Sequence, residues 1–154
     1  MADLRSVMQA TIDRFVENNT QAVKQKEEKL LSAALASNCI RMYRPLSFSQ
    51  RYPQFFKPQI SNAEYEAQMR HELQTMQDVS QSVTRTVIDT VGLKASIGIE
   101  KTVFTTDAKT IVEVILDLDF TEDGKQITQV MEFVDTYQST KVLEEILGNM
   151  ASAQ

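Results

Sequence analysis

Residues 119–135 have the sequence DFTEDGKQITQVMEFVD, and the rest of the chain is organised around them. Asp123 and Gly124 lie between runs rich in Val, Ile, Leu and Phe. This arrangement predicts a tight hairpin, because glycine supplies the positive φ that short strand connections need. The alternation of residues 126–135 then predicts a strand that pairs back on the run before the turn.

Two carboxylates lie on that strand among apolar neighbours. Glu132 shares one face with Val130 and Val134, whereas Asp135 falls on the other face. A carboxylate among apolar side chains loses hydration, so its charged form is disfavoured and it can carry protons near neutral pH. We expect Glu132 to act as the general acid or base. Asp135 is the second candidate, and it is equally suited to capping the end of the strand.

Composition narrows the class of protein. With 154 residues, 42% hydrophobic and 24% charged, the chain fits one globular domain over residues 1–154. The net charge of −5 and scattered basic residues argue against nucleic acid or a membrane as partner. The single cysteine, Cys39, excludes an internal disulfide framework, and no apolar run has the length of a signal peptide or a membrane span. We expect a soluble cytoplasmic protein.

Three helices are predicted in the first half of the chain. Apolar residues at helical spacing indicate helices over residues 2–18 and 20–37, with a break between them. A capping box that begins at Ser61 starts a third helix over residues 61–76, whose apolar stripe includes Tyr65 and Met69. His71, the single histidine, falls on a more polar face of that helix.

A short strand and a long connection separate the second and third helices. Residues 39–44 alternate so that Arg41 and Tyr43 share one face, and Pro45 ends the strand. Residues 46–60 are interpreted as an irregular segment with four aromatic side chains. Long loops in compact domains usually cover a site or make an interface. The segment can either form a lid over a site or pack its aromatic side chains against the hydrophobic core.

The rest of the chain predicts an antiparallel meander. Residues 79–89, 93–104, 110–120 and 126–135 can pair in sequence, and a final helix over residues 137–150 can pack on the domain or on a second subunit. Helices gathered on one side of such a sheet give an α+β domain. If the sheet curves strongly, the helices leave its concave side partly unfilled, and a small-molecule pocket remains.

Short motifs add a resemblance to a known family. They are SNC at residues 37–39, NAEY at residues 62–65, and FTEDGK at residues 120–125 followed seven residues later by EFVD. With the order of elements, they resemble the nuclear transport factor 2-like superfamily over residues 8–135. Within it the chain is similar to the SnoaL-like group of small fungal enzymes that cyclise or isomerise polyketide and meroterpenoid intermediates.

The resemblance implies both a fold and a site. The fold is a cone-shaped, curved, mostly antiparallel sheet packed against three N-terminal helices, with a homodimer formed across the sheet and cofactor-free acid–base catalysis in the cone. Glu132 and Asp135 match positions of an acid near the pocket, and Arg41 matches a basic or polar pocket residue. Arg41 could stabilise a developing oxyanion, with Tyr43 donating to the same oxygen, or it could form an ion pair with Glu132 or with an acid of residues 110–120. Both alternatives stay open.

The remaining site predictions concern proton transfer and substrate contact. His71 completes the candidate catalytic set, because an imidazole suits proton transfer at neutral pH. We expect a hydrophobic small-molecule substrate to contact Tyr43, Tyr65, Met69, Phe48, Phe55, Phe56, Val114 and Leu116. One His and one Cys cannot make the usual zinc sets, and no phosphate-binding loop is present, so no metal or cofactor is expected.

The sequence therefore predicts a cofactor-independent isomerase or cyclase of a hydrophobic polyketide- or terpenoid-derived intermediate, with lyase-type dehydration possible from the same groups. A second interpretation is a pericyclase, in which shape and one hydrogen-bond donor hold a reactive conformer. A third is a non-catalytic dimerising or ligand-binding domain. It predicts that Glu132 and Arg41 are exposed or pair with each other and that the loop aromatics fill the cone.

Overall fold

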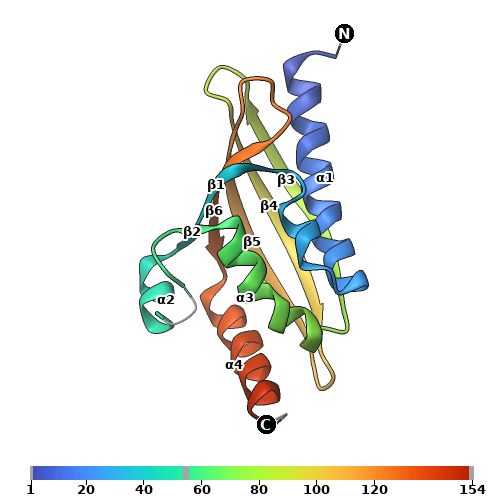
Figure 1. Ribbon diagram of the computed structural model, residues 1–154, viewed down its shortest axis with the longest axis vertical. Helices are drawn as coiled ribbons and strands as arrows, with labels where there is room; N and C mark the ends of the chain where they lie inside the picture. Colours follow the sequence, from blue (N-terminus) through green and yellow to red (C-terminus); the bar gives the residue numbers. More distant parts are fainter. Residues whose placement is uncertain (1, 54–55, 153–154) are drawn as a thin grey trace.

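The computed structural model describes the backbone of residues 2–53 and 56–152 and the side chains of residues 2–53 and 56–148. Its elements, in chain order, are α1 (Leu4–Gln25), the 3₁₀ helix η1 (Glu28–Ser32), β1 (Leu35–Arg44), α2 (Leu46–Arg51), β2 (Ile60–Ser61), α3 (Asn62–Thr75), β3 (Asp78–Asp89), β4 (Lys94–Phe104), β5 (Lys109–Phe120), β6 (Ile127–Val134) and α4 (Thr136–Ser152). Figure 1 shows their arrangement.

The predicted hairpin is confirmed between β5 and β6. Gly124 has φ 69° and donates its N–H to the carbonyl of Thr121 at 2.8 Å. A Cβ at Gly124 would lie 2.9 Å from Met8 Cγ, so the turn presses against α1 where a larger residue would not fit. Thr11 Oγ1 of α1 also donates to the Gly124 carbonyl at 2.8 Å. The turn between β5 and β6 is therefore fixed against α1 by a hydrogen bond and by close packing.

The sheet has the order β2-β1-β6-β5-β4-β3. Strands β3 to β6 form the expected antiparallel meander, and β1 adds to β6 in parallel. The register of β3 shifts between Val83 and Arg85, opposite Gly98. A Cβ at Gly98 would lie 3.0 Å from Thr84 Oγ1. Such an irregularity bends a sheet. Here the extra residue lies in β3, whereas β4 runs without a break through Gly98.

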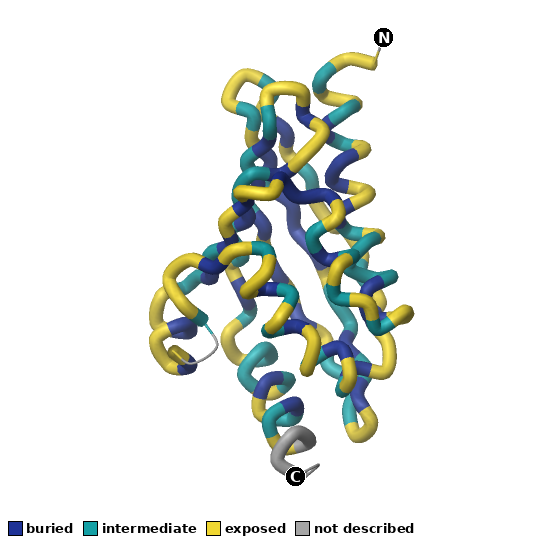
Figure 2. The backbone as a smooth tube through the Cα atoms, in the orientation of Figure 1, coloured by how far each residue is buried: buried dark blue, intermediate teal, exposed yellow. Residues whose placement is uncertain are grey.

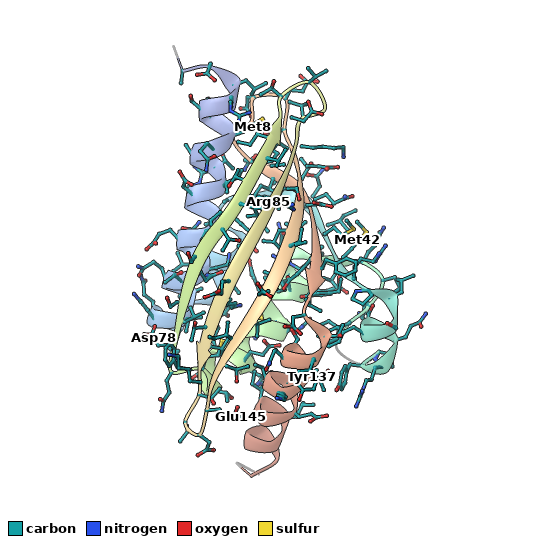
Figure 3. The ribbon with its side chains drawn as sticks, turned by 180° about the vertical axis from the view of Figure 1, so that it is seen from behind. Met8, Met42, Asp78, Arg85, Tyr137 and Glu145 are labelled. Atoms are coloured by element: carbon teal, nitrogen blue, oxygen red, sulfur yellow. The ribbon has the colours of Figure 1, made fainter. Side chains whose placement is uncertain are left out.

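The helices α1 and α3 lie on one face of this curved sheet, and α4 continues from β6 below them (Figure 1). Seen from behind, the opposite face carries no helix of the described residues (Figure 3). Buried residues lie along the strands of the sheet and on parts of α1, α3 and α4 (Figure 2). Met8, Ile12 and Phe15 of α1 pack there against Ile97 and Leu118 of the sheet. The hydrophobic core therefore lies between the sheet and the helices that cover one of its faces.

The prediction of two N-terminal helices with a break near residue 19 is wrong, because α1 is continuous from Leu4 to Gln25. Asn19 Nδ2 donates to the Phe15 carbonyl at 2.9 Å, and Thr20 Oγ1 donates to the Val16 carbonyl at 3.4 Å. These polar side chains bond back to their own helix and do not interrupt it. The helix ends instead at Lys26, whose φ is 56°.

The segment predicted as the end of the second helix is also different. After the 3₁₀ helix η1, strand β1 starts at Leu35, four residues earlier than expected. Leu35 and Ala36 are buried, and the carbonyl of Ala34 accepts from the N–H of Ile127 at 3.1 Å. Pairing with β6 therefore outweighs the helical preference of these residues.

The connection over residues 46–60 is not wholly irregular, since it begins with the short helix α2. Its buried aromatic side chains form a cluster in which the ring centroids of Phe48 and Tyr52 are 5.6 Å apart. The capping box at the start of α3 is confirmed: Ser61 Oγ accepts from the Glu64 N–H at 3.2 Å, and Glu64 Oε2 accepts from the Ser61 N–H at 2.8 Å. None of the described helices is both long and apolar enough to cross a membrane.

Candidate active site

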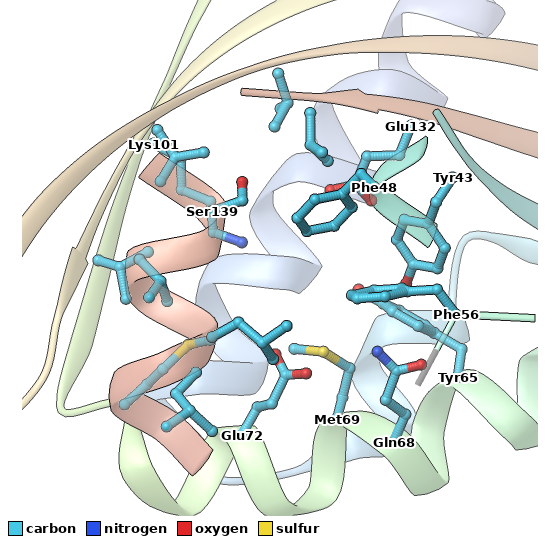
Figure 4. Close-up of a pocket in the computed structure, with 18 residues that line it drawn as sticks. Tyr43, Phe48, Phe56, Tyr65, Gln68, Met69, Glu72, Lys101, Glu132 and Ser139 are labelled. Atoms are coloured by element: carbon cyan, nitrogen blue, oxygen red, sulfur yellow. The ribbon is translucent and has the colours of Figure 1, made fainter. Parts of the chain in front are cut away.

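A cavity of about 120 Å³ lies between the concave face of the sheet and the helices α2, α3 and α4. Its walls are mainly aromatic and aliphatic, with a few polar groups, as is usual for sites that bind small molecules. Figure 4 shows the labelled side chains converging on it. They are Tyr43, Phe48, Phe56, Tyr65, Gln68, Met69, Glu72, Lys101, Glu132 and Ser139.

Glu132 reaches this cavity from the middle of β6. Its Oε2 accepts a hydrogen bond from Arg41 Nη1 of β1 at 2.8 Å, which makes an ion pair. The parallel pairing of β1 with β6 sets Tyr43 beside Glu132 in register and places Arg41 beside Val130. The Arg41 side chain is 5% exposed and that of Glu132 is 21% exposed. The carboxylate is therefore the member of the pair that opens into the cavity.

Arg41 lies behind Glu132. It lines a smaller space of about 30 Å³ that shares four residues with the main cavity: Tyr65, Lys101, Val114 and Glu132. The Tyr65 ring covers the guanidinium, with Arg41 Cζ 3.9 Å from the ring centroid. Arg41 Nε and Nη2 are buried and bond to no partner among the described residues. Of the two alternatives for Arg41, the structure shows the ion pair with Glu132, which fixes the orientation of the carboxylate.

Two phenols stand beside the carboxylate. Tyr43 and Tyr65 are both buried and both line the cavity. Burial raises the pKa of Tyr65 to about 12 and that of Tyr43 well above its usual value. Both side chains are therefore neutral at physiological pH and can donate a hydrogen bond to a ligand oxygen.

Glu72, which is not among the residues predicted from the sequence, is a second carboxyl group in the same cavity. It rises from α3 opposite β6, so Glu72 and Glu132 enter from different walls (Figure 4). Burial raises the pKa of Glu72, and the negative charge of Glu132 contributes in the same direction. Lys101 and a hydrogen bond with Gln68 partly offset this shift. The cavity thus holds one ion-paired carboxylate and one carboxyl group biased toward its protonated form.

A signal for Glu72 was present in the sequence. It lies seven residues after Tyr65, so at roughly 100° per residue it is only about 20° from Tyr65 around the helix axis. It therefore falls within the apolar stripe that Tyr65 and Met69 define, although it is charged. A carboxyl group at such a position is either paired or placed in a cavity.

Asp135 does not reach the cavity. Strand β6 ends at Val134, and Asp135 Oδ1 accepts from the N–H groups of Tyr137 and Gln138 at 3.1 Å each. It caps the start of α4 and lies along a groove on the opposite face of the sheet, with Arg85. The structure therefore separates Asp135 from Glu132, because a regular strand turns them to opposite faces.

The other predicted residues are divided between the cavity and its surroundings. Phe48, Phe56, Tyr65, Met69 and Val114 line the main cavity, whereas Leu116 lines the smaller space behind it.

His71 is exposed and lies in an outer groove between α3 and α4, apart from Glu132. Phe55 lies outside the described residues. Across the described part of the chain, no group of three or more His, Cys, Asp or Glu side chains is placed to hold a metal ion.

Comparisons by sequence find no match: no protein-family model fits the chain, and no curated protein matches it. Comparison by structure does find relatives. The BvnE pinacolase from Penicillium brevicompactum superposes with a TM-score of 0.80 at 15% identity, covering 99% of this chain and 100% of its own.

Two further fungal structures are similar. PrhC from Penicillium brasilianum has a TM-score of 0.77 at 14% identity and covers 97% of this chain and 93% of its own. AusH from Aspergillus nidulans has a TM-score of 0.71 at 16% identity and covers 85% of each chain. Other similar structures are described as an NTF2-like protein and as having a cystatin-like fold. The chain therefore has the α+β, cone-shaped fold of the nuclear transport factor 2-like superfamily, as its sequence motifs implied.

Proposed function

We propose that this protein is a cofactor-independent isomerase or cyclase that acts on a hydrophobic polyketide- or terpenoid-derived intermediate. The observation that carries the proposal is the ion-paired Glu132 carboxylate, which opens into an aromatic-lined cavity opposite Glu72. One structural neighbour is a fungal pinacolase. Isomerisation by proton transfer needs positioned acid and base groups, and this cavity contains two carboxyl groups.

The two carboxyl groups suit different roles. Arg41 orients Glu132 and balances its charge, so Glu132 is the group that removes a proton from an acidic C–H or hydroxyl. Glu72, whose pKa burial raises, donates a proton or a hydrogen bond to the substrate oxygen that gains charge. The hydroxyl groups of Tyr43 and Tyr65 can support the same oxygen.

For an enolisable ketone the step balances as follows. Glu132 takes the α-proton, the C–H electron pair forms the C=C bond of an enol, and the carbonyl π electrons move to oxygen. Glu72 protonates that oxygen. In the isomerisation of a β,γ-unsaturated ketone, the O–H proton of the resulting dienol returns to Glu72 as the C=O bond re-forms, while the γ carbon takes the proton held by Glu132. In a ring closure, the enol carbon attacks an internal carbonyl, the enol O–H proton returns to Glu72, and Glu132 protonates the new alkoxide oxygen.

The protein also acts as a homodimer in this proposal, with the helix-free face of the sheet as the interface. Ile111, Ile115 and Phe133 are 50%, 44% and 48% exposed there. Ile115 and Phe133 are partners across β5 and β6, so they form one apolar patch on that face. Exposed apolar patches of this kind are frequently interaction surfaces.

The proposed chemistry can be tested without the natural substrate, using exchange of the acidic C–H protons of 3-methylcyclohex-2-enone in D₂O, followed by NMR. We expect the protein to accelerate exchange, and Glu132→Gln to lower the catalysed rate by about 10²- to 10⁴-fold. Glu113→Gln is the control, because Glu113 is exposed on the opposite face of the sheet. Equal acceleration by Glu132→Gln would contradict the proposal. No acceleration by the unchanged protein would favour the pericyclic interpretation, in which shape matters more than proton transfer.

A further inference from the structure

The main cavity is small for the class of substrate proposed above. Its volume is about 120 Å³, whereas pockets that enclose drug-sized ligands usually measure about 300–1,000 Å³. A single functionalised ring fits such a space, but the remainder of a multi-ring polyketide or terpenoid does not. The rest of the molecule must then lie elsewhere on the protein.

A second space of about 270 Å³ lies directly outside the cavity, in the groove between α3 and α4. It shares four lining residues with the cavity: Gln68 and Glu72 of α3, and Leu143 and Ile146 of α4. The two spaces therefore adjoin each other along these four side chains.

The chemistry of the groove differs from that of the cavity. Away from the shared residues its walls include the apolar Ile60, Ala67 and Leu147 and the exposed His71. Charge lies at the rim, where Lys57 Nζ and Glu64 Oε1 are 3.0 Å apart in an exposed ion pair. An apolar body can thus be buried along the groove without desolvating the charged pair.

We infer that the α3–α4 groove is the outer half of a single bipartite substrate site, which holds the apolar ring system of a molecule whose reactive oxygen-bearing ring occupies the cavity. Glu72 and Gln68 stand at the junction, beside the bond between the two parts of the ligand. The groove thereby selects substrates with a bulky apolar body, while the cavity provides the chemistry. This inference rests on the proposed function of the cavity.

The test uses two enone probes that share one ring. The probe 3-methylcyclohex-2-enone represents the reactive ring alone, and testosterone contains a similar enone ring within a four-ring skeleton. Dissociation constants are measured by ligand-observed NMR for the unchanged protein, for Ala67→Trp, which fills the groove, and for Ala63→Trp. Ala63 is the matched control, because it is exposed on the same helix and does not line the groove.

We expect testosterone to bind the unchanged protein and Ala63→Trp equally. Ala67→Trp should weaken testosterone binding by at least about tenfold, equivalent to about 1.4 kcal/mol, and should leave the small enone within about twofold. Equal testosterone binding by Ala67→Trp would overturn the inference, as would failure of testosterone to bind while the small enone does. If neither probe binds, the cavity itself is not a ligand site and the proposed function fails as well. Ala67 is exposed, so thermal unfolding should confirm that Ala67→Trp folds.

Discussion

Replacing Glu132 and replacing Arg41 in their ion pair should lower the free energy of unfolding by different amounts. Glu132→Met leaves the guanidinium buried at 5% exposure, and arginine cannot lose its proton. The expected loss in unfolding free energy is about 3–5 kcal/mol. Arg41→Met leaves a carboxylate that is 21% exposed to the cavity and can hydrate or take up a proton there. The expected loss is about 1–3 kcal/mol.

The double variant Arg41→Met/Glu132→Met, compared with the two single variants, gives the interaction energy between the two charges. Two unit charges about 4 Å apart attract each other by about 4 kcal/mol at an effective dielectric constant near 20, and cavity solvation reduces this to about 2–4 kcal/mol. We expect a coupling energy of that size from urea unfolding at pH 7 and fixed protein concentration, followed by circular dichroism. Equal losses for the two single variants, or a double variant whose loss is their sum, would refute this reasoning.

Three further predictions concern stability and assembly. Glu72→Gln should raise the unfolding temperature at pH 7–8, because burial raises the Glu72 pKa and its ionised form is disfavoured in the folded state. This increase in unfolding temperature should vanish below pH 4.5, where Glu72 is protonated in both the folded and the unfolded state. The exposed control Glu100→Gln should show no such pH dependence. Gly124→Ala should destabilise by about 1–3 kcal/mol in urea unfolding, because of its positive φ and close contact with α1. By contrast, Gly148→Ala, whose Cβ would meet no atom within 4 Å, should be neutral or stabilise α4 by up to about 1 kcal/mol. Phe133→Glu should convert the proposed homodimer to a monomer in analytical ultracentrifugation, and an unchanged mass would argue against that interface.

Local signals in the sequence predicted much of the fold. The Asp123–Gly124 turn, the capping box at Ser61 and the alternation of β5 each depend on neighbouring residues, and each is present in the structure. The failures also have local causes. Asn19 and Thr20 looked like a break because such residues are common at helix ends, but their side chains bond within α1.

The site was harder to predict because it is assembled from distant segments. Arg41 and Glu132 were found as candidates, and the parallel pairing of β1 with β6 brings them together. Helical spacing does mark Glu72 as a carboxyl group beside the apolar stripe of α3, but the cavity that it faces forms only when α3 packs over the curved sheet. Asp135 was favoured by the resemblance, yet β6 ends at the preceding residue and Asp135 turns to cap α4.

A crystal of the protein under xenon pressure would show whether the cone is hollow beside Glu132. Xenon enters apolar cavities without needing a specific ligand. We expect a xenon atom among Phe48, Met69 and Val114, with the Glu132 carboxylate facing it and held by Arg41. A filled interior that admits no xenon, or a Glu132 side chain turned to bulk solvent, would rule out the proposed site.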